Sequence, residues 1–145
     1  MVHNNERNVR ENYDLAIKQI TTRMPSIHVR TGPIVSDPAA SIATTTLYTT
    51  TIVTQESGHF RVLATLITTR AGAGGTASVT ITWNNGSATQ TAVSNNISLT
   101  ILGNEVDFVV PLFSAAGQNI TYATTVTASA GNPAYSLNIK LEFMS

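Results

Sequence analysis

From about residue 43 onward, apolar side chains tend to recur at every second position, and this periodicity constrains the fold more than any other feature. In the segment at about 59–70, for example, Phe60, Val62, Ala64 and Leu66 fall on one face. Each such segment is rich in Val, Ile, Thr and aromatic residues and is bounded by turn-forming residues. We count eight strand candidates, at about 44–54, 59–70, 76–83, 88–93, 97–102, 105–112, 119–128 and 134–143.

Eight short strands in about 100 residues predict an all-β fold, an antiparallel jelly roll or a similar β-sandwich. The Asn85-Gly86 pair predicts a tight hairpin turn after one of these strands. Several strands are apolar on both faces, as in Phe108-Val-Val beside Leu112 and Phe113, whereas a sheet with one solvated face should alternate cleanly. The second apolar face therefore needs a partner, either the N-terminal part of the chain or another subunit.

The N-terminal part has a different pattern. Residues 5–22 place Val9, Tyr13, Ala16, Ile17 and Ile20 on one stripe of a helix, which Pro25 would end. This helix could pack on a protein surface or associate with copies of itself. Residues 24–42 contain three prolines and a glycine, which exclude a long helix or a central strand. We expect an extended arm that lies along its own domain or along a neighbouring subunit.

We therefore divide the chain into an N-terminal helix and attachment arm, residues 1–42, and a β domain, residues 43–145. Charge follows a similar division: residues 1–37 hold nine of the sixteen charged side chains, and the next 108 residues hold only seven. Typical domains are about one-quarter charged. A surface in which Thr, Ser and Asn replace Lys and Glu presents little repulsion to a second copy, so we expect self-association.

Composition excludes several classes of function. The chain has no cysteine, so disulfides and cysteine-based metal sites are impossible. The formal net charge of zero argues against a nucleic-acid partner, because binding phosphates requires a basic excess. No apolar run approaches the roughly 20 residues that span a bilayer, so we expect no membrane partner. The polar N-terminus resembles no signal peptide, and we expect an unprocessed product of the cytoplasm.

No residue pattern indicates catalysis, and we expect no enzyme activity and no cofactor. His3, His28 and His59 are scattered and lack metal-ligand spacing. Glu105 and Asp107 share one face of a strand, but a solvated strand edge explains them better than acid–base work or calcium binding. The chain contains no Gly-x-Ser-x-Gly elbow, and its Gly-rich loop at 71–76 lacks the ending of a phosphate loop.

Trp83 is the best candidate for contact with a glycan. It ends a strand beside the Asn84-Asn85-Gly86 turn, where an aromatic ring could stack on a sugar next to side-chain amides. The competing interpretation is that Trp83 closes the end of the apolar core, because it shares a face with Val79 and Ile81.

Five segments resemble parts of a known family. Ile120-Thr-Tyr-Ala-Thr-Thr-Val-Thr and the run from Ala130 to Glu142 are similar to the C-terminal β domain of tailed-bacteriophage virion structural proteins. The Gly58-His-Phe-Arg-Val segment, the Gly72-Ala-Gly-Gly-Thr loop and Ser78-Val-Thr-Ile-Thr-Trp resemble earlier strands of such domains. The resemblance covers about residues 57–143. It implies a jelly roll akin to tumour-necrosis-factor-type trimers, in a protein of the head, neck or tail, and no catalytic residues.

We therefore predict a non-enzymatic virion protein, made in the host cytoplasm, that forms a homo-oligomer, most simply a trimer, and binds other virion structural proteins. Capsid decoration, a tail location and host attachment all remain open. Two alternatives are a carbohydrate- or receptor-binding module built around Trp83 and a small hydrolase of unrecognised type. The residues predicted at the subunit interface are Phe108, Tyr122, Tyr135, Leu137, Ile139, Leu141 and Phe143. Those predicted to attach the chain to the particle are Val9, Tyr13, Ile17, Ile20, Ile27 and Val29.

Overall fold

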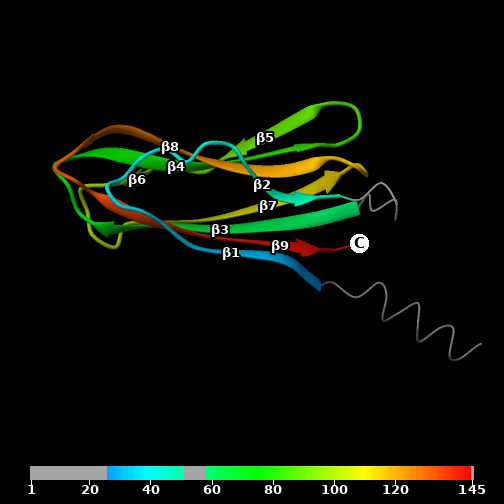
Figure 1. Cartoon of the computed structure of the whole chain (residues 1–145), viewed down its shortest axis with the longest axis horizontal. Helices are drawn as coiled ribbons and strands as arrows, with labels where there is room; N and C mark the ends of the chain where they lie inside the picture. The colour runs from blue at the N-terminus through cyan, green and yellow to red at the C-terminus, as the bar shows by residue number, and fades with distance from the viewer. Residues whose placement is uncertain (1–25, 51–57, 145) are drawn as a thin grey trace, which may run out of the picture.

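The computed structural model describes residues 26–50 and 58–144, and this part of the chain consists of antiparallel β-strands and their connections (Figure 1). The prediction of an all-β antiparallel fold is confirmed. The strands are β1 (Ser26–Ser36), β2 (Thr45–Thr49), β3 (Gly58–Arg70), β4 (Gly74–Asn84), β5 (Thr89–Val93), β6 (Ile97–Ser98), β7 (Glu105–Ser114), β8 (Asn119–Ala130) and β9 (Ala134–Phe143).

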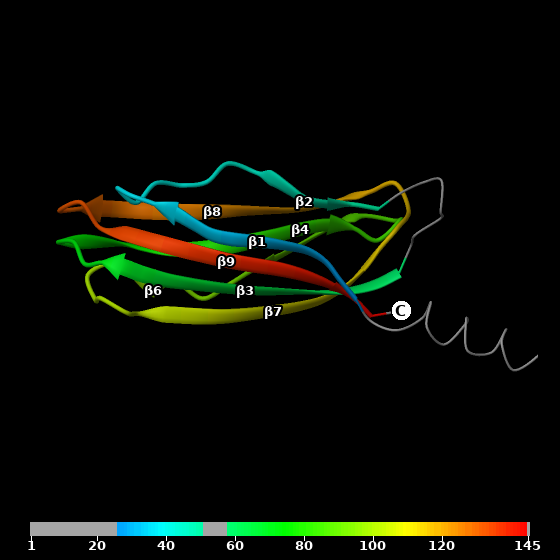
Figure 2. The ribbon, with the colours of Figure 1, turned by 60° about the horizontal axis from the view of Figure 1, so that its bottom comes forward.

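Two sheets lie face to face, as the two views of the ribbon show (Figures 1 and 2). Sheet A has the strand order β1-β9-β3-β7, and sheet B has the order β2-β8-β4-β5, with β6 also paired to β4. The pairing is nested: β1 pairs with β9, β2 with β8, β3 with β7, and β4 with β5 and β6. A long hairpin rolled up in this way is a jelly roll.

The described residues form nine strands, whereas the sequence predicted eight. The additional strand is β1, which lies in the stretch assigned to the arm and forms an edge of sheet A against β9. Its register shifts between Thr31 and Ile34, where Gly32 and Pro33 interrupt the pairing, as expected for proline at a sheet edge. The sequence left open whether the arm lies along its own domain or along a neighbouring subunit. In the structure, β1 lies along the chain's own domain.

The strand predicted at 97–102 is much shorter than expected, because only Ile97 and Ser98 pair with β4. The chain then turns through Gly103, whose φ is +77°. The side-chain amide of Asn104 accepts a hydrogen bond from the Ser98 backbone nitrogen at 2.6 Å. This local bond closes the turn and ends the strand, although Ile101 and Leu102 continue the apolar composition.

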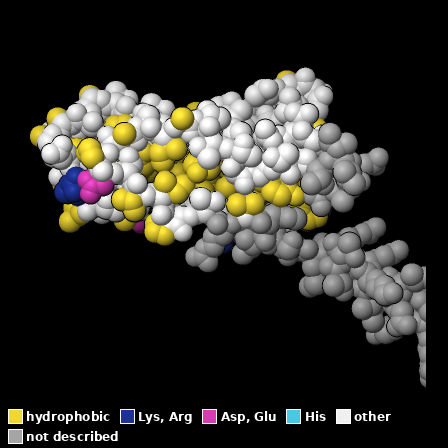
Figure 3. All heavy atoms as spheres, in the orientation of Figure 1, with side chains coloured by type: hydrophobic (Ala, Val, Ile, Leu, Met, Phe, Trp, Pro, Cys, Tyr) yellow, Lys and Arg dark blue, Asp and Glu magenta, His cyan; other side chains and the backbone are white. Residues whose placement is uncertain are grey.

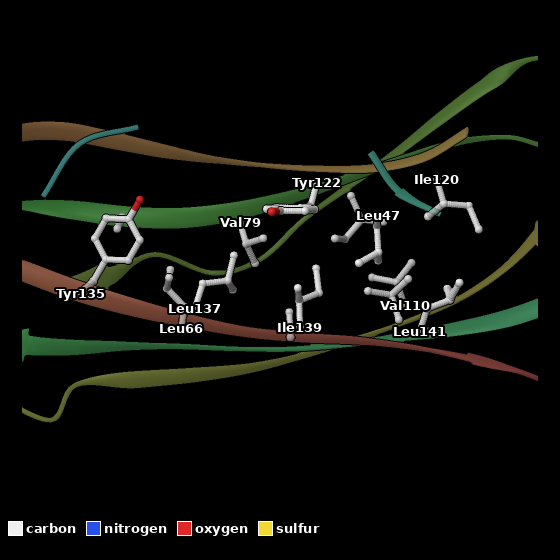
Figure 4. Close-up of a cluster of buried hydrophobic side chains, with 14 of the residues drawn as sticks. Leu47, Leu66, Val79, Val110, Ile120, Tyr122, Tyr135, Leu137, Ile139 and Leu141 are labelled. Carbon is white, nitrogen blue, oxygen red and sulfur yellow. The ribbon is translucent and has the colours of Figure 1, made fainter. Parts of the chain in front are cut away.

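The core lies between the two sheets and is built from alternate residues of the long strands. In β3 the side chains of Phe60, Val62, Ala64 and Leu66 are buried, whereas the residues between them are at least partly exposed. Figure 4 shows the labelled core side chains filling the space between the two layers. Within the described residues, no helix is long and apolar enough to cross a membrane.

Backbone and hydroxyl groups together fasten the connector between β1 and β2 to the core, and the backbone bonds include one from the Ala39 nitrogen to the Pro133 carbonyl at 2.8 Å and one from the Thr124 nitrogen to the Ile42 carbonyl at 3.1 Å. The hydroxyl of Tyr135, a fully buried residue of β9, lies 2.6 Å from Thr124 Oγ1 and donates a hydrogen bond to the carbonyl oxygen of Ala40 at 2.6 Å. Thr124 Oγ1 also accepts a hydrogen bond from the backbone nitrogen of Ile42 at 2.8 Å. These bonds hold residues 40–42 against β8 without a regular strand pairing.

Candidate functional site

The histidine and acidic side chains that the sequence offered for chemistry are dispersed in the part of the chain that the structure describes. No group of three or more His, Asp or Glu side chains there could hold a metal ion. Asp107 accepts a hydrogen bond from Thr65 Oγ1 at 2.7 Å, on the outer face of sheet A. His59 lies edge-on to the Phe113 ring, with centroids 5.2 Å apart. His3 lies outside the described residues.

The outer face of sheet A carries a group of neighbouring apolar side chains, which we call the apolar patch. It consists of Leu63 on β3 and of Val109, Pro111 and Phe113 on β7. Val109 is 53% exposed and Phe113 is 39% exposed. The register places Leu63 directly opposite Val109, and His59 opposite Phe113. The side chains of the patch are therefore neighbours on one face.

The patch lies beside a free sheet edge that resists further strand pairing. Among the described strands, β7 is the last of sheet A, and its one partner there is β3. Pro111 lies in the middle of β7, and proline has no N–H with which to extend a ladder. Glu105 and Asp107 add charge at the start of the same strand. Proline and charge on an edge strand are devices that prevent edge-to-edge association, so a partner of this region would have to cover its face.

Charged side chains flank the patch along β3 and β9. Arg61 Nε donates to Glu142 Oε2 at 2.9 Å, Arg61 Nη2 bonds to the same oxygen, and Lys140 Nζ lies 3.5 Å from Glu142 Oε1. The hydrogen bond from Arg61, together with the positive charges of Arg61 and Lys140, lowers the pKa of Glu142 below its ordinary value, although burial opposes this. Glu142 is therefore a shared counter-ion for two basic residues.

The outer face of sheet B has a different character, because within the described strands it carries no charged side chain. Hydroxyl and amide groups cover it instead, and many belong to threonine. On β4, β8 and β2, the outward positions are Thr76, Ser78, Thr80, Thr82, Asn84, Asn119, Thr121, Ala123, Thr125, Thr127, Thr46 and Thr49. On the face of the molecule that Figure 3 shows, charged side chains are also few, and most of the described surface is uncharged.

Trp83 points to the inner side of sheet B, on the same face of β4 as Val79 and Ile81. It is partly buried and packs against the core cluster. Its cross-strand neighbour is Gln90 of β5, and the following turn is closed by Asn85 Oδ1, which accepts hydrogen bonds from the backbone nitrogens of residues 87 and 88 at 2.9 Å. The placement agrees with a residue that closes the end of the core, while leaving part of its ring accessible.

The residues predicted at the subunit interface are not on the outer surface, and this prediction is wrong for most of them. Tyr122, Tyr135, Leu137, Ile139 and Leu141 are at most 6% exposed and lie between the two sheets (Figure 4). Their side chains fill the core of their own subunit and cannot reach another. The remaining two residues, Phe108 and Phe143, are partly buried and also pack against that core.

On β7 the exposed apolar residues are instead those that alternate with the predicted Phe108, namely Val109, Pro111 and Phe113. In the run from Phe108 to Phe113, the even-numbered positions face inward and the odd-numbered ones face outward. The two-faced composition was visible in the sequence, but the choice of face was not. The signal that could have identified the outer face is the pair Glu105 and Asp107, because these charged residues share the face of Val109, Pro111 and Phe113, and charged side chains are rarely buried.

The predicted attachment residues divide into two groups. Val9, Tyr13, Ile17 and Ile20 lie outside the described residues, as does the side chain of Ile27. Val29, in contrast, lies opposite Leu141 in β1 and packs against the core of its own subunit. It is therefore not available to another protein of the particle, and for Val29 the prediction is corrected.

No protein-family model and no curated protein matches this chain. Three solved structures show a distant likeness. The CBM22-1–GH10 modules of Clostridium thermocellum xylanase 10B, with xylohexaose, align over 77% of this chain and 25% of theirs, at 10% identity and a TM-score of 0.38. A structure of infectious bursal disease virus, strain Gx, aligns over 83% and 33%, at 13% identity and a TM-score of 0.35.

The third structure is the carbohydrate-binding module CBM6cm-2 of Cellvibrio mixtus lichenase 5A, in complex with cellotriose. It aligns over 82% of this chain and 95% of its own length, at 10% identity and a TM-score of 0.30. The chain thus spans a quarter and a third of the first two structures. No conclusion about function follows from likenesses at this level.

Proposed function

We propose that this protein is a non-enzymatic, self-associating structural subunit of a tailed-phage virion, located in the head, neck or tail. The observation that carries the proposal is the apolar patch, because exposed contiguous apolar surface on a folded domain marks an interaction site. The uncharged outer face of sheet B supports it, since such a surface offers little electrostatic repulsion to a neighbouring protein.

The virion assignment itself rests on the resemblance of residues 57–143 to phage structural domains, which also implies a trimer. In this proposal, residues 1–25 attach the subunit to other virion proteins, and the jelly roll forms the contacts between subunits. The first part predicts that a chain lacking residues 1–25 still folds but no longer binds to the particle. Circular dichroism and co-sedimentation with particles would measure the two properties separately.

Size-exclusion chromatography with light scattering tests self-association directly. We expect the full chain to elute with a mass that is a multiple of its 15.4 kDa subunit. A subunit that remains at 15.4 kDa at concentrations of about 100 μM, well above the Kd of a weak specific interface, would contradict the proposal.

A second candidate function is glycan binding at Trp83. It is favoured by the partly accessible ring beside Gln90 and the Asn84-Asn85 turn, an arrangement of one aromatic surface with nearby amides. We expect that, if this function holds, glycan-array binding is lost in Trp83→Ala and retained in Asn95→Ala, which changes an exposed amide elsewhere. Equal binding by both variants would remove Trp83 as the contact.

A further inference from the structure

The described strands at the edges of the two sheets differ in how they are protected against pairing with another chain. At the edges of sheet A, β7 carries Pro111 and two carboxylates, and β1 loses register with β9 around Gly32 and Pro33. At one edge of sheet B, the register of β2 with β8 shifts between Thr46 and Tyr48. Proline, charge and bulges all hinder the addition of a further strand.

Strand β5, at the other edge of sheet B, has none of these features. Its five residues include neither a proline nor a charged side chain, and they pair with β4 in continuous register from Thr89 to Val93. Five residues is an ordinary strand length. No described strand lies on the far side of β5, which runs along the upper right rim in Figure 1. An open and uncharged edge of this kind is a template for pairing with another strand.

The hydrogen bonds at the two ends of the β4–β5 pairing show which backbone groups of β5 are open. Near the turn, Asn85 donates to the carbonyl oxygen of Ala88 at 3.2 Å, and at the far end Ser94 donates to that of Val79 at 2.9 Å. In an antiparallel ladder, residues that bond to the partner alternate with residues whose N–H and C=O point away. Because residues 88 and 94 both bond toward β4, so do residues 90 and 92. The groups that point to the open edge are those of Thr89, Thr91 and Val93.

These open groups match those of a second copy when two β5 strands run antiparallel with Thr91 opposite Thr91. In that register, Thr89 of each copy lies opposite Val93 of the other. All three pairs are then of the hydrogen-bonded type, and since each such pair exchanges two bonds, the strands share about six backbone hydrogen bonds. The paired stretch is about 17 Å long, at about 3.4 Å per residue.

We propose that β5 pairs with β5 of a second copy about a two-fold axis that passes beside Thr91, perpendicular to the sheet. Sheet B then continues across the contact, in the order β2-β8-β4-β5-β5-β4-β8-β2. This inference rests on the proposed function, because it assumes that the chain self-associates. It goes beyond that function in naming a second surface, on the sheet opposite to the apolar patch, and a symmetry.

The side chains beside the edge favour a copy of this chain as the added strand. Both outer faces lie on the same side after the half-turn, so a row of four threonines in one copy joins the same row in the other. Across the contact, Val93, which is 58% exposed, lies beside the methyl group of Thr89. No charge on β5 selects an acidic or a basic strand, and in an isologous contact every favourable pair occurs twice. The residues of the row, from β2 to β5, are Thr46, Thr121, Thr82 and Thr91.

Amide hydrogen exchange, followed by NMR on the full chain, tests the pairing directly. We expect the amides of Thr89, Thr91 and Val93 to exchange at least tenfold more slowly at concentrations where the chain associates than in dilute protein. The amides of Gln90 and Ala92 are the internal control, because they bond to β4 in both states and should not change. If the chain associates and the three open amides exchange at the same rate as in dilute protein, the β5 contact is overturned.

The second test identifies the residue beside the axis. Thr91→Lys and Thr91→Glu should each weaken dimerisation at least tenfold, because each places like charges directly opposite one another. An equimolar mixture should recover association, since opposite charges then face each other. Thr82→Lys is the matched control: across three strand spacings its two copies would be about 14 Å apart, where salt screens their repulsion, so association should not change. Analytical ultracentrifugation measures the dissociation constants.

A third variant keeps the test independent of charge. Thr91→Pro removes an N–H that points to the open edge and leaves the bonds to β4 in place, and proline is accepted in an edge strand at such a position. We expect it to prevent the dimer as well. Circular dichroism shows that each variant compared is folded.

The proposal is supported if the wild-type mass is an even multiple of 15.4 kDa, the charged variants lower it and their mixture restores it. An oligomer that Thr91→Lys and Thr91→Pro both leave intact would overturn the β5 contact while the proposed function stands, because the chain then assembles through another surface. A wild-type monomer would overturn both. Protection of the open amides only after another protein is added would also overturn the pairing of two copies.

Discussion

The hydroxyl group of Tyr135 gives a prediction whose size follows from the structure. Tyr135→Phe removes one oxygen atom from a fully buried ring and leaves its packing unchanged. It breaks the hydrogen bond to the Ala40 carbonyl and the one to Thr124, both 2.6 Å long. A neutral hydrogen bond contributes about 1 kcal/mol, and leaving a buried partner without one adds about 1–3 kcal/mol. We expect a loss of about 2 kcal/mol in the free energy of unfolding.

Urea denaturation measures this loss. For an m value of about 1.5 kcal/mol/M, a loss of about 2 kcal/mol lowers the midpoint by about 1.3 M. Tyr122→Phe is the matched control, because Tyr122 is also buried on a strand but its hydroxyl makes no hydrogen bond within the described residues. Its midpoint should stay close to that of the wild type. If Tyr135→Phe changed stability by less than about 0.5 kcal/mol, or no more than the control, the account of the connector would be refuted.

Three further predictions concern charge, backbone and core. Glu142→Gln should destabilise the protein at neutral pH, because the bond to Arg61 lowers the folded-state pKa of Glu142. The difference from wild type should shrink once the pH falls below the ordinary glutamate value of about 4.3 and vanish only below the lowered folded-state pKa, as denaturation at several pH values would show. Gly131→Ala should lower the stability more than Gly103→Ala in thermal melts. Both glycines have a positive φ, which costs about 1 kcal/mol for alanine at Gly103, but only at Gly131 would the new Cβ also lie 2.7 Å from a backbone atom of the facing chain. Leu137→Ala should lower the free energy of unfolding by about 2–5 kcal/mol through the cavity it leaves, and a loss below 1 kcal/mol in urea would argue against its place in the core.

The sequence by itself determined most of the strands, because alternation, β-branched residues and turn signals act over a few neighbouring residues. Strand β9, for example, was predicted with the bounds that the structure shows, 134–143. The pattern also placed Trp83 on the same face as Val79 and Ile81, where it packs on the core. Alternation divides a strand into two sets of side chains without stating which set faces inward.

That choice was made by the tertiary structure. Over residues 108–113 of β7 both sets are apolar, and the pairing of the strand with β3 against sheet B turns Phe108 inward and Val109 outward. The arm is a similar case, since its prolines excluded a central strand, but only the nested pairing with β9 made it an edge strand. Local sequence sets the strands, whereas burial of one face of each strand depends on contacts between residues far apart in the chain. The apolar patch is therefore a property of the fold. On β7 the sequence analysis chose Phe108, which faces inward, and the residues that face outward are Val109, Pro111 and Phe113.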